Sequence, residues 1–453
     1  MITQSPRRLA RLLLCGLWLS GITGIALAAT PQQFVHDVAP EKVGANPAEI
    51  AKMDALLQSM VDEQKLGNVV GFVAKGGNVV YERAFGWKDI ENRVPAKVDD
   101  YYVLMSQTKA IATVAFMTLV EQGKVAIDDP VSKYFPEIPD KVVTKVNPDG
   151  TYESRPVKSP MTFVHLMSHT SGLNAGLVSE LRGGARGGPP GSPGATAAPA
   201  TPPGATPTPA GPPPFMRNGR TLRDAMHELV KYPLGFDPGT QYHYHISTSM
   251  LAYMVERISG KSLRDYVKET IFEPLGMNDT DWYYTAEGMT RFVKTYRSVD
   301  GKLEPAVSRG GPRPTIDKAT YFDGAAGLNG PIEDYAKFCQ MMLNKGEFNG
   351  HRILKRETVE QMTTINRLPP EAIGAEKDMQ FGLGFEIHKT KKPVPAVSDS
   401  AYAWGGALGT QYLIDPEHDL VLLFYQNMQN QTAKLSPLFY EQAYRLFAAP
   451  ATK

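Results

Sequence analysis

The sequence places a serine and a lysine three residues apart, in the segment Ser106-Gln107-Thr108-Lys109. Apolar residues recur after it at helical spacing as far as Gly123, a residue type that commonly ends helices. Positions i and i+3 share one face of a helix, so the ammonium of Lys109 should lie beside the hydroxyl of Ser106. A serine becomes a strong nucleophile when a neighbouring base takes its proton. The pair therefore predicts nucleophilic acyl transfer.

The position of Ser106 at a helix N-terminus adds free N–H groups and a favourable dipole for an incoming carbonyl oxygen. The alternative is that Ser106 only caps the helix and that Lys109 lies in solvent. Two observations favour chemistry: the chain has no other Ser-x-x-Lys, and the residues around Lys109 are strongly apolar. A lysine in a buried helix needs a reason, because burying a charge is costly.

The N-terminus has the pattern of an export signal. Arg7, Arg8 and Arg11 precede the apolar run 12–27, which ends at the small-residue cleavage site Ala26-Leu27-Ala28. We expect residues 1–28 to be a signal peptide and the mature protein to be periplasmic or secreted. The alternative is a retained N-terminal anchor.

Charge and cysteine content limit the choice of partners. The net charge is +1, and removing residues 1–28 deletes three arginines and no acid, which leaves −2. This balance, without a basic stripe, disfavours a nucleic-acid partner. No other stretch is long and apolar enough to predict a membrane span. With Cys15 removed, Cys339 is the sole cysteine, so we expect no internal disulfide and a stability that comes from core burial.

The hydrophobic patterns predict an α+β fold. Strands and helices at both ends of the chain, with helices between them, predict a sheet lobe built from both termini and an inserted, mostly helical lobe. The expected strands are 69–74 and 79–84, joined by Lys75-Gly76-Gly77-Asn78, and 411–414 and 420–425; the expected helices include 48–66, 249–259, 263–272 and 436–447.

Residues 183–214 differ in composition from the rest of the chain. They include 11 prolines and 8 glycines, no acid and a single charge, Arg186. Such a stretch cannot bury enough apolar surface to offset its ordering entropy, so we expect a disordered insertion within one domain, 29–450. Its role is either passive or that of a lid or docking segment.

Further segments resemble a known family. They are His165–Leu173 (His-Leu-Met-Ser-His-Thr-Ser-Gly-Leu), Asp128–Tyr134, Phe272–Thr280, Tyr335–Phe338 and Phe381–Gly384. Together with Ser106-x-x-Lys109 they resemble the serine β-lactamase and penicillin-binding protein superfamily. The likeness is greatest to its class C-like branch, which also contains carboxylesterases and D-amino-acid-specific peptidases. The resemblance covers nearly the whole mature chain and implies a β-lactamase/transpeptidase-like fold.

The resemblance implies a nucleophile, Ser106, its paired base, Lys109, and a tyrosine from a Tyr-x-Asn-type motif. We assign that tyrosine to Tyr244, with Tyr242 as the alternative, because the family places it at this distance after Pro238-Gly239-Thr240. Ile246 stands where the family has asparagine, and isoleucine cannot hydrogen-bond a substrate amide. Which of Lys109 and Tyr244 is the effective base stays open, since the two should titrate together.

The third family element, Lys-Thr-Gly, is absent from the chain, and Trp404-Gly405-Gly406 stands in its place. This is similar to the variant found in the family's esterases and some acyltransferases. An indole in place of a cation favours an apolar or neutral acyl group over a carboxylate-bearing substrate. The resemblance also implies an oxyanion hole formed by the N–H groups of Ser106 and Ala407. The alternative role for Trp404 is that of a core aromatic.

Together these features predict an exported serine hydrolase that cleaves carboxylic esters through an acyl-enzyme, without a metal or cofactor. Its partner would be a small-molecule ester or amide. One alternative is a β-lactamase or D-amino-acid-specific peptidase, and another is a non-catalytic penicillin-binding or structural relative. His243 and His245 share a strand face but lack a third zinc ligand, and we expect His169 to be structural.

Overall fold

The computed structural model describes residues 33–147, 150–181, 220–306, 315–370, 378–429 and 435–448. All of them belong to one compact unit, 31–453. The predicted signal peptide, 1–28, and the predicted insertion, 183–214, lie outside the described residues, so both stay predictions.

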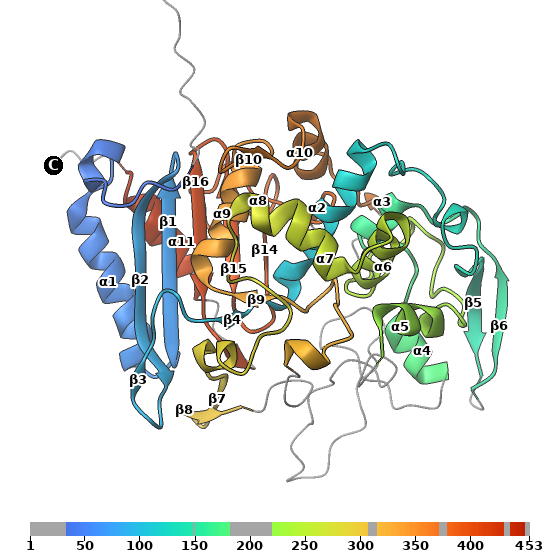
Figure 1. The fold of residues 1–453 in the computed structure, drawn as a ribbon, viewed down its shortest axis with the longest axis horizontal. Coiled ribbons are helices and arrows are strands. Elements are labelled where there is room, and N and C mark those ends of the chain that lie inside the picture. Colours follow the sequence, from blue (N-terminus) through green and yellow to red (C-terminus); the bar gives the residue numbers. More distant parts are fainter. Residues whose placement is uncertain are drawn as a thin grey trace, which may run out of the picture. The chain divides into compact units, whose positions relative to one another are not determined.

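An antiparallel sheet forms the centre of this unit (Figure 1). Among the described residues it has eight strands in the order β12-β13-β14-β15-β16-β1-β2-β3. Three come from the N-terminal part: β1 (Asn68–Lys75), β2 (Asn78–Asp89) and β3 (Val94–Pro95). Five come from the C-terminal part: β12 (Gln380–Phe381), β13 (Glu386–Ile387), β14 (Tyr402–Gly405), β15 (Gln411–Asp415) and β16 (Leu420–Tyr425). The predicted α+β fold with a sheet built from both ends of the chain is therefore confirmed.

The first and last long strands pair directly, with Val70 opposite Tyr425. Alternate residues of β1 enter two different cores, because side chains of a strand point to opposite faces. Val69 and Val73 pack with α1 (Pro47–Asp62) and α11 (Ser436–Arg445). Phe72 and its neighbours on the other face belong to the larger core, which includes α9 (Ile332–Leu343) and the helix that follows Ser106.

The helix that follows Ser106 and the rest of the helical lobe lie between the two halves of the sheet in sequence. Its main helices are α2 (Thr108–Glu121), α3 (Phe163–Met167), α4 (Ala175–Leu181), α5 (Leu222–Leu229), α6 (Ser247–Ser259), α7 (Leu263–Val267), α8 (Glu273–Leu275) and α10 (Arg356–Thr363). Short strand pairs accompany them: β4 (Tyr102–Val103) with β9 (Asn329–Gly330), β5 (Lys141–Val146) with β6 (Tyr152–Pro156), β10 (Glu347–Phe348) with β11 (His351–Arg352), and β7 (Tyr296–Val299) with β8 (Lys302–Pro305) and β17 (Met428–Gln429). Helices α2 and α6 pack against each other, which brings the serine segment and the tyrosine segment together.

The expected helix 263–272 is not one regular α-helix. Helix α7 is followed by a π-helical turn, Lys268–Phe272, and then by α8. Pro274 explains the change, because proline has no N–H to donate to the carbonyl four residues earlier. The expected helix 48–66 also ends early, at Asp62. The predicted hairpin around Gly76 and Gly77 is confirmed, and both glycines have positive φ angles.

Candidate active site

Ser106 lies in a 3₁₀ turn, η2 (Met105–Gln107), that leads directly into α2. Its side chain does not cap the helix. The Nζ atom of Lys109 instead donates to Ser106 Oγ at 3.1 Å and to the carbonyl oxygen of Ala325 at 2.7 Å. Lys109 is only 1% exposed, so the alternative of a solvated lysine is wrong. Within the described residues this buried lysine forms no ion pair.

The turn that carries Ser106 is held from several sides. Met105 has φ 48°, a left-handed conformation that is costly for a residue with an unbranched apolar side chain. The hydroxyl of Tyr335 donates to the Gln107 carbonyl at 2.9 Å, and the hydroxyl of Tyr425 donates to its side-chain oxygen at 2.7 Å. Both hydroxyls therefore bind the residue that follows Ser106.

Tyr244 lies over the buried lysine, with Lys109 Nζ 4.6 Å from the centre of its ring. The indole N–H of Trp404 donates to the Tyr244 hydroxyl oxygen at 2.9 Å. The structure therefore brings Ser106, Lys109, Tyr244 and Trp404 together from three distant parts of the sequence. Trp404 is half-buried and hydrogen-bonded to the site, so it is more than a core aromatic.

Tyr242 and Ile246 lie on either side of Tyr244 in sequence and have other environments. Ile246 is 1% exposed and belongs to the main core, which explains how an apolar residue is accommodated at the family's asparagine position. Tyr242 packs with Trp404 against a small cluster that contains Phe381. This cluster gives the site an apolar aromatic border.

Gly406 allows β14 to approach the serine segment closely. A Cβ atom at this position would overlap the carbonyl oxygen of Leu104, two residues before Ser106. The next residue, Ala407, is exposed. Within the described residues, neither the N–H of Ser106 nor that of Ala407 donates a hydrogen bond to another group. The assignment of these two N–H groups to an oxyanion hole stays a prediction. Gly405 faces the side chain of Gln411, which a Cβ atom would also overlap.

Two histidines, the buried His169 and the partly buried His245, lie near the lysine and tyrosine, and His243 lies one residue before Tyr244 in sequence. Burial, followed by the charge of Lys109, lowers the pKa of His169 well below its usual value. The same two causes lower the pKa of His245 to about 3, and burial lowers the pKa of His243. The ring of His169 contacts Tyr244 with centroids 4.8 Å apart. No sequence signal indicated this contact beyond the His-Thr-Ser-Gly turn itself.

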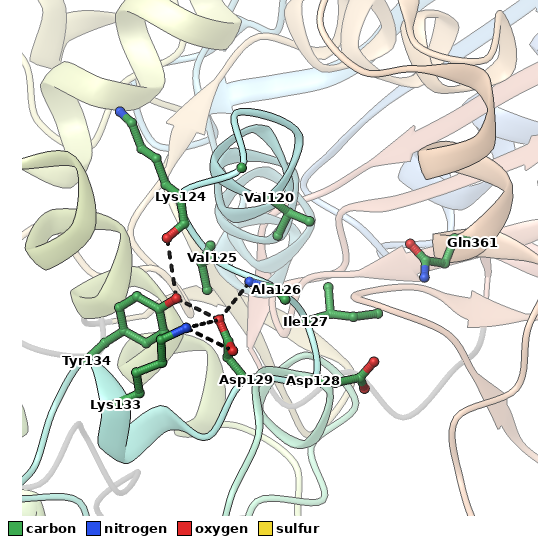
Figure 2. Close-up of a pocket in the computed structure, with 11 residues that line it drawn as sticks. Val120, Lys124, Val125, Ala126, Ile127, Asp128, Asp129, Lys133, Tyr134 and Gln361 are labelled. Atoms are coloured by element: carbon green, nitrogen blue, oxygen red, sulfur yellow. Dashed lines mark hydrogen bonds and ion pairs between the residues drawn. The ribbon is translucent and has the colours of Figure 1, made fainter.

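A second feature, an open pocket of about 560 Å³, lies at the opposite end of α2 (Figure 2). Its lining includes Lys124, Asp129, Lys133 and Tyr134, and none of the candidate site residues. Within the described ranges, no group of three His, Cys, Asp or Glu residues is arranged to hold a metal ion. No helix in the described part of the chain is long and apolar enough to cross a bilayer.

The family model for Beta-lactamase matches residues 53–444, which is most of the chain. The chain belongs to the beta-lactamase family. Esterase EstB of Burkholderia gladioli is 27% identical over 408 residues, covering 83% of this chain and 90% of EstB. A lovastatin esterase of Penicillium rubens is 27% identical over 392 residues, covering 81% of this chain and 90% of that protein.

The solved structure of unliganded simvastatin synthase (LovD) from Aspergillus terreus is similar to this beta-lactamase family member with a TM-score of 0.69 and 20% identity. The similarity covers 88% of this chain and 97% of LovD. At this level of identity the likeness shows the fold, a β-lactamase/transpeptidase-like architecture. The family and its esterase members together make this chain a serine hydrolase.

Proposed function

We propose that the protein hydrolyses carboxylic esters, with Ser106 as the nucleophile and the Lys109–Tyr244 pair as its base. The hydrogen bond from Lys109 Nζ to Ser106 Oγ carries this proposal, because it joins a nucleophile to a buried basic group without an intervening acid. The names of the related esterases support the substrate class. The apparent signal peptide further supports a periplasmic or secreted location.

In the proposed reaction, Ser106 transfers its proton to the coupled Lys109–Tyr244 pair as its oxygen attacks the ester carbonyl. The N–H groups of Ser106 and Ala407 stabilise the tetrahedral oxyanion. Collapse expels the alcohol, which takes the proton from the pair, and leaves an acyl-enzyme. A water molecule then attacks the acyl carbon and gives one proton to the same pair. The bond between Ser106 Oγ and the acyl carbon breaks, Ser106 takes that proton back, and the acid is released.

The surroundings of Tyr244 support esters over amides and β-lactams. Trp404 donates a neutral hydrogen bond at the position where a cation would bind a substrate carboxylate. Ile246 is buried in the core and offers no amide to a peptide-like substrate. A neutral acyl group against an aromatic border suits this environment best.

The decisive experiment compares hydrolysis of p-nitrophenyl butyrate and nitrocefin by the purified chain without residues 1–28. We expect fast ester cleavage, negligible nitrocefin turnover, and loss of ester cleavage in Ser106→Ala with an unchanged melting temperature. A Ser106→Ala variant that kept near-normal ester turnover would exclude the mechanism. Nitrocefin turnover of comparable efficiency would favour an amide substrate instead. Absence of fluorophosphonate labelling at Ser106 would favour a binding or structural role.

A further inference from the structure

His169 occupies an unfavourable position in the fold. It has φ 59°, a left-handed conformation, and its side chain is 1% exposed. Its Nδ1 atom has no hydrogen-bond partner within the described residues. Backbone strain and an unpartnered buried polar atom both destabilise a fold, and such positions concentrate where function requires them. The fold keeps a histidine here although its ring nitrogen gains no structural hydrogen bond.

Positive φ angles occur at several described non-glycine residues. Asn, Asp and His are the non-glycine types most often found at positive φ. Eight of the eleven described non-glycine residues with positive φ are Asp, Asn, Gln, Lys or Arg: Asp37, Gln64, Arg93, Asp300, Lys345, Asn349, Asp378 and Asp419. The others among the described residues are Met105, His169 and His245. Met105 precedes Ser106, His245 follows Tyr244, and His169 contacts the Tyr244 ring. Three of the described positive-φ residues thus lie at or beside the proposed nucleophile and tyrosine.

The backbone of the segment 169–172 holds the loop that carries Tyr244. Four contacts of 2.8 Å join them: His243 N–H to the His169 carbonyl, Gly239 N–H to the Thr170 carbonyl, Gly235 N–H to the Gly172 carbonyl, and the Ser171 hydroxyl with the Ser247 hydroxyl. Three of these bonds use main-chain atoms and do not depend on the side chain at position 169. The imidazole ring must therefore contribute through a different contact.

The shortest ring contact of His169 is with Tyr244; its ring centroid also lies 5.5 Å from that of Phe381 and 5.9 Å from that of Tyr242. His169 and Tyr244 meet in a T-shaped arrangement, with centroids 4.8 Å apart and planes at 68°. Lys109 lies over the face of the same tyrosine ring, and Trp404 binds its hydroxyl. The tyrosine is thus held by the Lys109 amine over its face, a donor at its oxygen and a third ring. Edge-to-face contacts of this kind fix the orientation of aromatic rings.

We propose that His169 is a positioning residue that fixes the ring of Tyr244 in the orientation needed for proton transfer from Ser106. This inference rests on the proposed function. The neutral imidazole of His169 packs against Tyr244 without placing a positive charge next to Lys109. Its effect is indirect, since His169 acts only through Tyr244.

The test uses three variants in the chain without residues 1–28. His169→Asn removes the ring and suits the left-handed backbone, because asparagine tolerates positive φ. His169→Phe keeps an aromatic ring and removes both nitrogens. Ser171→Ala is the matched control, because it removes a side-chain bond from the same segment and leaves the ring contact in place.

We expect His169→Asn to lower kcat on p-nitrophenyl butyrate about tenfold or more, with KM within about twofold, since small misplacements of a reacting group cost rate more than binding. We expect His169→Phe to restore kcat to within about threefold of the unmodified enzyme, and Ser171→Ala to keep kcat. Melting temperatures of all variants show whether each is folded.

A folded His169→Asn variant with unchanged kcat would overturn the proposal, as would an equal loss of kcat in Ser171→Ala. If His169→Phe does not fold, the rate at which a fluorophosphonate labels Ser106 in His169→Asn decides: slower labelling supports the proposal and an unchanged rate overturns it. These outcomes are separate from failure of the proposed function, which would appear as ester turnover in Ser106→Ala.

Discussion

The two ends of helix α2 present similar residue types in opposite electrostatic settings. At its N-terminal end, Lys109 lies 4.6 Å from the ring centre of Tyr244, and at its C-terminal end Lys133 lies 5.1 Å from the ring centre of Tyr134. Lys109 contacts a hydroxyl and a carbonyl oxygen, whereas Lys133 contacts both oxygens of Asp129. Figure 2 shows the group at the C-terminal end: the side chains of Lys133 and Tyr134 and the backbone of Ala126 all bond to the carboxylate of Asp129.

The carboxylate determines the protonation states at the C-terminal end. The hydrogen bonds from Tyr134, Ala126 and Lys133 lower the pKa of Asp129 to about 2. In return, the hydrogen bond from Lys133 to Asp129 raises the pKa of Lys133. Burial, followed by the hydrogen bond from Tyr134 to Asp129, raises the pKa of Tyr134. A lysine held charged and a tyrosine held neutral in this way cannot serve as a base near neutral pH. The two lysine–tyrosine contacts therefore differ in burial and in partners: Lys109 is buried and has no carboxylate partner among the described residues, whereas Lys133 is exposed and bonds to Asp129.

The largest expected difference comes from removing each lysine. Lys109→Met should lower kcat/KM on p-nitrophenyl butyrate by about 10²–10⁴-fold, the usual contribution of a general base. Lys133→Met, at a side chain that is 58% exposed, should leave kcat/KM within about twofold, because surface ion pairs contribute little. Parallel steady-state assays of the two variants measure this. Equal losses in both would show that the lysine effect is structural.

Removing the hydroxyl of each tyrosine should again lower kcat at the N-terminal end of α2 and leave it unchanged at the C-terminal end. Tyr244→Phe keeps the ring over Lys109 and loses the oxygen that Trp404 binds, so we expect a fall in kcat of about 10²-fold. Tyr134→Phe loses one hydrogen bond to Asp129 and should leave kcat unchanged. A Tyr244→Phe enzyme with normal kcat would move the proton-transfer role to Lys109 alone.

A smaller effect is expected from Trp404→Phe, which keeps an aromatic ring and removes the N–H donor to Tyr244. A neutral hydrogen bond contributes about 1 kcal/mol, so kcat should fall by about fivefold to tenfold. Trp404→Lys, by contrast, should lower esterase activity through both the lost bond and the added charge. Unchanged ester turnover in both variants would show that Trp404 has no role in the reaction.

The smallest effects concern the dependence of stability on pH. His245 has a folded pKa of about 3, below its unfolded value, so the unfolded chain binds more protons between pH 6.5 and 3 and stability falls as pH decreases through this range. Asp129, with a folded pKa of about 2, loses its contribution only as pH falls from about 4 to 2. Thermal melting against pH should show a flatter slope above pH 4 for His245→Asn and no change there for Asp129→Asn. A flatter slope above pH 4 in Asp129→Asn would contradict this assignment.

Short-range patterns predicted much of the fold. The hairpin around Gly76 and Gly77, the strands 411–414 and 420–425 and the helix after Ser106 all follow from local spacing and turn residues, and all are present. The division of the helix 263–272 was not predicted, because a π-helical turn depends on how Pro274 and the packed core share the backbone bonds.

The candidate site was predictable where a motif carried it. Ser106 lies in the η2 turn that leads directly into α2, and Lys109 lies three residues on, so their proximity follows from helical spacing. The contact of His169 with Tyr244 was not predictable, because the two residues lie far apart in sequence and the histidine turn has the composition of an ordinary loop. The segment Asp128–Tyr134 was noted in the sequence for its family resemblance, but the pocket that it lines was not predicted.

The sequence by itself determined the family, the α+β class and the serine–lysine pair, because these depend on local spacing and on motifs read in order. Only the tertiary structure decided that Lys109 is buried without an acid, that Trp404 donates to Tyr244, and that His169 and His245 lie near them. These properties depend on which distant segments pack against α2. Burial and the neighbouring charges set protonation states, and neither is encoded in the spacing of residues along one segment.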